Sequence, residues 1–124
     1  MKLFFILFIS LTFSGIMLNS CTKENEATIL GDGIFCADGL VSYQNNIKPI
    51  LQNNCYECHS TTVAQNGIIL DTYAGVTDAI NNGFVLPQIN HVNGAAKMPF
   101  GRAKLSDCII ATIEKWVAEG MLNN

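Results

Sequence analysis

The segment Cys55-Tyr56-Glu57-Cys58-His59 is the most informative part of this sequence. It places two thiols, separated by two residues, directly before an imidazole, so three reactive or metal-binding side chains fall within one turn of backbone. A chance occurrence of this pattern in so short a chain is improbable. We therefore expect the fold to be organised around whatever these three side chains hold.

Size and charge narrow the possible classes of protein. A chain of 124 residues forms at most one domain once any processed segment is removed. A domain of this size buries a limited core and is often stabilised by a metal, a cofactor or a disulfide. The net charge is −3, and the sequence contains no basic cluster. These properties argue against a general nucleic-acid-binding protein.

The N-terminal segment has the pattern of an export signal. Lys2 provides a positive charge, and residues 3–18 are nearly all apolar, a stretch too short to span a membrane comfortably. We therefore expect residues 1–20 to be a signal peptide. The alternative is an anchor helix that is not cleaved.

The end of this segment, Leu18-Asn19-Ser20-Cys21, resembles a bacterial lipobox, in which the cysteine becomes the lipidated N-terminus. Asn19 departs from that pattern, because a small or apolar residue is usual there. The resemblance implies lipidation of Cys21 and an exported, membrane-anchored lipoprotein of the bacterial cell envelope. Ordinary cleavage that leaves Cys21 free is the alternative. The polar residues 21–35 are expected to be a flexible tether to a domain over 36–124.

The chain has five cysteines, and an odd number needs an explanation in an exported protein. If Cys21 carries lipid and Cys55 acts together with Cys58, then Cys36 and Cys108 remain. These two can form a disulfide, which export permits and which would stabilise the fold by about 4 kcal/mol in the chain-entropy model. A Cys55–Cys58 disulfide is the alternative, but it would leave the adjacent histidine without a role.

Apolar spacing, caps and helix breakers predict a small, mostly α fold. A helical turn is expected over 44–47 and a short helix over 48–53, with a proline in its first turn. Asp71 is expected to cap a helix over 72–80. Residues 84–101 contain two prolines and two glycines, so we expect a long loop without regular structure.

The last predicted helix is the clearest. Ser106 is suited to be its N-cap, Asp107 favours the positive helix end, and Gly120 is a natural stop. The helix carries one apolar stripe, which predicts that it faces the core. The stripe consists of Ile109, Ile110, Ile113, Trp116 and Val117.

The CxxCH pattern is the attachment signature of a c-type haem. Each thiol can add to one haem vinyl group, and the next residue then lies under the iron. We therefore predict one covalent haem c, with Cys55 and Cys58 as thioether anchors and His59 as the proximal iron ligand. One alternative is a structural zinc site that also uses His91. Another is a thioredoxin-like redox pair, which needs a βαβ context that the chain does not offer.

The sixth iron position needs a second ligand or stays open. Histidine and methionine are usual in electron transfer. Met98 is the expected ligand, because it lies in a polar, glycine-rich segment where a core methionine is not expected, and Pro99 restricts it to extended backbone. His91 is the alternative ligand, and an open position is a third possibility.

With these residues in place, the chain resembles the small monohaem cytochromes c, most closely a bacterial lipoprotein type. The resemblance covers most of the mature sequence and implies a mostly α cytochrome c fold, with terminal helices packed across each other and His59/Met98 ligation. Phe100 is a departure, because a small or polar residue or a second proline is common after Met-Pro. Besides the CxxCH segment, the similar pieces are residues 47–51, 70–76, 97–99, 104–107 and 113–117, and a cysteine pair equivalent to Cys36 and Cys108.

The expected function is electron transfer by a non-enzymatic carrier with one haem. Its partners would be transiently bound redox proteins and, through the acyl anchor, a lipid membrane, with no nucleic acid and no small-molecule substrate. Two other classes remain open: a gas or small-ligand sensor with an open sixth site, and a surface accessory module. A reduced spectrum that does not respond to carbon monoxide would exclude the sensor.

Overall fold

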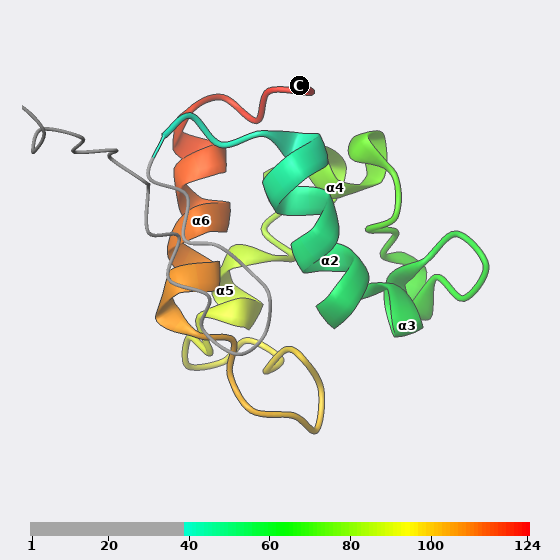
Figure 1. Ribbon diagram of the computed structural model, residues 1–124. Helices are drawn as coiled ribbons and strands as arrows, with labels where there is room; N and C mark the ends of the chain where they lie inside the picture. The colour runs from blue at the N-terminus through cyan, green and yellow to red at the C-terminus, as the bar shows by residue number, and fades with distance from the viewer. Residues whose placement is uncertain (1–38) are drawn as a thin grey trace, which may run out of the picture.

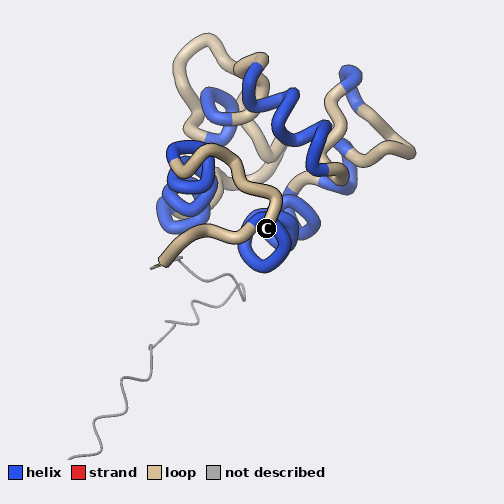
Figure 2. Tube along the Cα trace, turned by 90° about the horizontal axis from the view of Figure 1, so that it is seen from above, coloured by secondary structure: helices blue, strands red, loops and turns tan. Residues whose placement is uncertain are grey.

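The computed structural model describes residues 39–124. The predicted signal peptide (1–20), the lipidation of Cys21, the tether (21–35) and Cys36 lie outside the described residues and stay predictions. About half of the described residues are helical and none is in a strand (Figure 2). The mostly α prediction is therefore confirmed for this part of the chain. No helix within it is long and apolar enough to cross a membrane.

The first helical unit joins a π-helical turn, η1 (Tyr43–Ile47), to the helix α2 (Lys48–Asn54). The Ser42 side chain caps η1 by accepting a hydrogen bond from the Asn45 N–H at 3.2 Å. Pro49 lies in the first turn of α2, where its missing N–H leaves no helical hydrogen bond unmade. The turn and the helix expected from the sequence are both confirmed.

The C-terminal helix α6 (Asp107–Ala118) also follows the prediction. The Ser106 hydroxyl accepts from the Ile109 N–H, and Gly120 ends the helix region at φ +89°, which glycine adopts without strain. The apolar stripe faces the core, and Thr112 is buried beside it. Its buried apolar members are Ile109, Ile110, Ile113 and Trp116, while Val117 is partly buried.

Helix α4 (Tyr73–Asn81) forms one residue later than expected, and its predicted cap is wrong. Thr72 is the N-cap, because its backbone is extended and its hydroxyl accepts from the Gly75 N–H at 3.1 Å. Asp71 instead accepts hydrogen bonds from the Thr61 N–H and hydroxyl, at 2.8 and 2.9 Å. Asp71 therefore closes the loop that follows the CxxCH segment, a loop that includes the 3₁₀ turn η2 (Gln65–Gly67).

The segment expected to be an irregular loop over 84–101 contains a short helix, α5 (Leu86–Ile89). The expectation was wrong because Pro87 occupies the first turn of this helix, a place where proline favours a helix rather than breaking it. The rest of the segment is irregular and contains no further helix.

The core joins the two ends of the described chain. Helix α6 packs against η1, and Figure 1 shows the C-terminal end beside the start of the η1–α2 unit. Trp116 is fully buried, with its ring 5.5 Å from that of Tyr43 and 6.3 Å from that of Tyr73. Asn124 then accepts hydrogen bonds from the N–H groups of Gln44 and Tyr43, each at 3.0 Å. Trp116 is therefore a core residue that fixes the terminal segments against each other.

Cys108 is disulfide-bonded. Its partner lies outside residues 39–124, because the other described cysteines, Cys55 and Cys58, are free thiols. The alternative Cys55–Cys58 disulfide is therefore not formed in this structure. Pairing of Cys108 with Cys36 stays a prediction.

Replacing Gly75 with alanine is expected to destabilise the protein, although alanine is normally favoured in a helix by about 1 kcal/mol. A Cβ at this position would lie 2.5 Å from the Ile69 carbonyl oxygen and 2.9 Å from the Thr72 hydroxyl. We expect a loss of about 1–3 kcal/mol, as for other overpacked sites, measured by urea unfolding. Ala74→Gly in the same turn measures the effect of helix propensity alone. A Gly75→Ala protein that is more stable than wild type would contradict the steric clash expected for the added Cβ.

Candidate haem-binding site

The CxxCH segment folds as one helical turn at the end of α2. The turn is α3 (Tyr56–His59), and the Cys55 carbonyl accepts from the N–H groups of Cys58 and His59, at 3.2 and 2.9 Å. Cys55 is the junction between α2 and α3, at φ −126° and ψ −35°. The two thiols and the imidazole are therefore carried by a single turn of backbone.

The two thiols differ in their surroundings. Cys58 is exposed, whereas Cys55 is partly buried and packs against the core. Burial raises the pKa of the Cys55 thiol to about 12, because the thiolate would lose its hydration. Cys55 therefore stays a neutral thiol, SH, throughout the physiological pH range.

The imidazole of His59 is not engaged by the rest of the described chain. Its Nδ1 is buried without a hydrogen-bond partner, while the His59 carbonyl accepts from the Leu70 N–H. The backbone of His59 is thus fixed, and no hydrogen bond from residues 39–124 competes for the ring. A neutral imidazole with a free lone pair is a good metal ligand.

Two more buried polar atoms near this turn lack partners: the Tyr56 hydroxyl and Asp71 Oδ1. Burial is the main cause that raises the pKa of Tyr56 to about 12, with smaller contributions from Tyr43, Asp71 and Cys55. Buried polar groups in folded proteins nearly always have a partner, which can be a ligand or water. The turn that carries the two free thiols and the unengaged imidazole is therefore surrounded by buried polar atoms that the described chain leaves unpaired.

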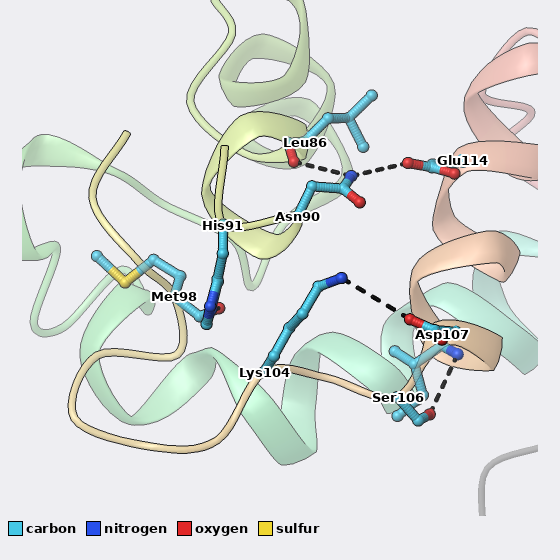
Figure 3. Close-up of polar contacts among 9 residues, drawn as sticks. Leu86, Asn90, His91, Met98, Lys104, Ser106, Asp107 and Glu114 are labelled. Carbon is cyan, nitrogen blue, oxygen red and sulfur yellow. Dashed lines mark hydrogen bonds and ion pairs between the residues drawn. The ribbon is translucent and has the colours of Figure 1, made fainter. Parts of the chain in front are cut away.

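The predicted sixth ligand, Met98, lies in the segment after α5 and is partly buried. Its N–H donates to the Gln88 carbonyl at 3.1 Å, and its carbonyl lies 3.0 Å from Nε2 of His91. Figure 3 shows the His91 ring beside the Met98 backbone and the Met98 side chain leading away from that ring. The Nε2 of His91 is therefore already used within the protein, which favours Met98 over His91 as an iron ligand.

A link between side chains connects the Met98 segment to the CxxCH turn. Arg102 forms an ion pair and hydrogen bond with Glu57, the third residue of that turn. Both side chains are more than half exposed, so the pair contributes little to stability. The pair shows that Arg102, four residues after Met98, lies beside the CxxCH turn. Phe100, the departure noted in the sequence, is 82% exposed in this segment.

The alternative sites proposed from the sequence are not supported by the described residues. Within 39–124, no group of three or more histidine, cysteine or acidic side chains could hold a metal ion, so Cys55, Cys58, His59 and His91 do not form the zinc site. The same part of the chain contains no strand, so it lacks the context of a thioredoxin-like pair.

Sequence reasoning missed the residues that hold the Met98 segment, namely Gln88, Asn90 and Glu114. Asn90 Nδ2 donates to Glu114 Oε1 of α6 at 2.7 Å and to the Leu86 carbonyl at 3.1 Å. The available signal was Pro87, which marks a possible helix start, but the pairing of Asn90 with α6 depends on the tertiary fold.

The thiol form of the protein is expected to lose stability as the pH rises above about 9. Unfolded Cys55 loses its proton near the ordinary value of 9.0, whereas the folded thiol keeps it to about 12. The unfolded state then binds fewer protons, so the free energy of unfolding falls, by up to about 1.4 kcal/mol per pH unit for one group. Urea unfolding between about pH 8 and 10 measures this slope.

Two variants separate Cys55 from the tyrosines, whose ordinary pKa of 10.0 is also raised by burial. Cys55→Ala should flatten the slope in this window, and the exposed Cys58→Ala should retain it. Equal slopes in all three proteins would show that Cys55 is not shielded from water.

Comparisons of the chain with protein-family models, curated proteins and solved structures found no match.

Proposed function

We propose that this chain is an electron-transfer protein that carries one covalently attached c-type haem. The observation that carries the proposal is the single turn that bears two free thiols and an unengaged imidazole. Cys55 and Cys58 would form the thioether bonds, His59 would be the proximal ligand and Met98 the distal ligand. When bound, the haem supplies a one-electron couple between ferrous and ferric iron.

The two cysteines make the attachment by addition. Each S–H adds across one vinyl C=C bond, so the sulfur bonds to one carbon, the hydrogen goes to the other, and nothing leaves. Cys58 is exposed, and the neighbouring Cys55 is a neutral thiol held against the core. After the addition Cys55 no longer titrates, so its contribution to the alkaline loss of stability should be absent from the haem-carrying protein.

The ligand pair decides the class of function. His59 offers a ring nitrogen that the described chain does not use, and the position of His91 on the Met98 carbonyl leaves Met98 as the better second ligand. Two filled axial positions suppress the binding of oxygen and other small molecules, which favours electron transfer over sensing or catalysis. A thioether opposite an imidazole also raises the reduction potential.

The proposal extends to the fold and to the location of the protein. The helical architecture, with α6 packed on η1, is compatible with a cytochrome c fold. The sequence favours export as a lipoprotein anchored through Cys21, with a Cys36–Cys108 disulfide in the domain. Redox partners of such carriers dock transiently through small interfaces.

Expression of the full chain in a host that matures c-type cytochromes tests the proposal. The purified protein should be coloured, should gain the mass of one haem after denaturation, and should take up and release one electron reversibly. A colourless protein without added mass would refute haem attachment. A ferrous form that binds carbon monoxide readily would instead indicate a small-ligand sensor, and a haem that does not exchange electrons would indicate an accessory module.

A further inference from the structure

We infer that His91 is a positioning residue: its imidazole and the end of α5 form a clamp that fixes the backbone of Met98. This inference rests on the proposed role of Met98 as the sixth iron ligand. It assigns to His91 a function other than iron ligation, and it explains why a short helix interrupts a segment rich in helix breakers.

The clamp holds both polar groups of the Met98 backbone. The Met98 N–H donates to the Gln88 carbonyl at 3.1 Å, and the Met98 carbonyl accepts from His91 Nε2 at 3.0 Å. Both partners belong to one turn, because the His91 N–H also donates to the Gln88 carbonyl at 3.2 Å. Met98 is therefore held from two sides by residues that move together.

The hydrogen bond between the His91 ring and the Met98 carbonyl determines which ring nitrogen carries a hydrogen. A carbonyl oxygen only accepts, so Nε2 must carry the hydrogen. An imidazole whose Nε2 holds a proton for this carbonyl cannot offer that nitrogen to iron. His91 itself adopts φ +56°, a conformation uncommon outside glycine but tolerated better by histidine than by most residues. His91 is the second residue after α5.

The turn that carries the clamp is tied to the C-terminal helix. Asn90 donates to Glu114 of α6 at 2.7 Å and to the Leu86 carbonyl at 3.1 Å, as Figure 3 shows. Ile89, the last residue of α5, is buried in the core. The turn that holds the Met98 backbone is thus bonded to α6, a helix with one face buried in the core.

The clamp is important because few other contacts restrain the position of Met98. Lys97 and Phe100 on either side are exposed, and beyond them the exposed Arg102–Glu57 pair is a weak restraint. Residues that orient a metal ligand through hydrogen bonds typically change metal affinity by about 10–100-fold when they are replaced. Loss of the His91 donor should therefore weaken the Met98–iron bond without removing haem.

The test compares three variants that share the same backbone requirement at residue 91. His91→Gln retains an N–H donor of similar reach, His91→Phe retains an aromatic ring without a donor, and His91→Ala retains neither. Imidazole titrated into the ferric haem protein competes with Met98 for the sixth position. We expect the apparent Kd of imidazole to fall about tenfold in the Phe and Ala variants, and His91→Gln to resemble wild type.

The outcomes separate the clamp from other roles of His91. An unchanged Kd in all three variants, or an equal fall in all three including His91→Gln, would overturn the inference. Complete loss of the sixth ligand in His91→Ala, with retention of that ligand in Met98→Ala, would show that His91 is the ligand itself.

A second measurement tests the clamp without haem. In the thiol form, hydrogen exchange of the Met98 amide should accelerate about tenfold in the Phe and Ala variants relative to an amide in the interior of α6, since loss of the hydrogen bond to the Met98 carbonyl also loosens the adjacent hydrogen bond of its N–H. His91→Gln should remain near wild type. If the wild-type chain carries no haem, the proposed function fails while this exchange still decides the clamp, and equal exchange in every variant refutes it.

Discussion

Replacing both Cys55 and Cys58 with alanine is expected to abolish covalent haem attachment completely. Neither methyl group can add to a vinyl bond, and no other free cysteine exists among the described residues, where Cys108 is disulfide-bonded. Each single variant should retain one thioether. The measurement is the mass of the denatured protein from a maturation-competent host, because unfolding removes haem that is held only by its iron ligands.

Tyr56→Phe is the matched control for this experiment. It changes one of the two residues between the cysteines but removes only a buried hydroxyl that has no partner in the described chain, so full haem attachment should persist. If the double alanine variant still carries the mass of a haem, attachment occurs elsewhere. If the tyrosine variant also loses haem, the segment acts through its fold rather than through the two thiols.

The sequence predicts the elements whose signals are local. Helix α6 has a serine cap, an apolar stripe and a terminal glycine within one stretch of chain, and all three act as expected. Helix α2 begins with a proline at a position that helices accept. The turn from Cys55 to His59 is local too, because the two thiols and the imidazole fall within five consecutive residues.

Features that depend on tertiary contacts could not be predicted in this way. Asp71 and Thr72 are both good caps, and the choice between them follows from Thr61, whose N–H and hydroxyl bind Asp71. Pro87 at the start of α5 predicts a helix break unless the helix is known to begin there. His91 appeared as a candidate ligand, and only its distance to the Met98 carbonyl indicates a different role.

Replacing Met98 with alanine is expected to leave haem attached but to change the sixth ligand. The variant lacks the proposed methionine ligand but keeps the proposed haem attachment at Cys55 and Cys58 and the proposed proximal ligand His59. Carbon monoxide should then bind the ferrous protein, and the weak absorption at the red end of the ferric spectrum should disappear. The reduction potential should fall by the order of 0.1 V, a part of the roughly 0.8 V that axial ligands span.

Met121→Ala provides the matched control, because it removes a second partly buried methionine at the far end of the chain. The Met121 carbonyl accepts from the Tyr73 hydroxyl at 2.7 Å, an interaction that alanine preserves, so the spectrum and the potential should stay as in wild type. If Met98→Ala leaves the red absorption and the resistance to carbon monoxide unchanged, Met98 is not the ligand. If the wild-type protein already binds carbon monoxide, the sixth position is open, and the geometry around Met98 serves a sensor rather than an electron carrier.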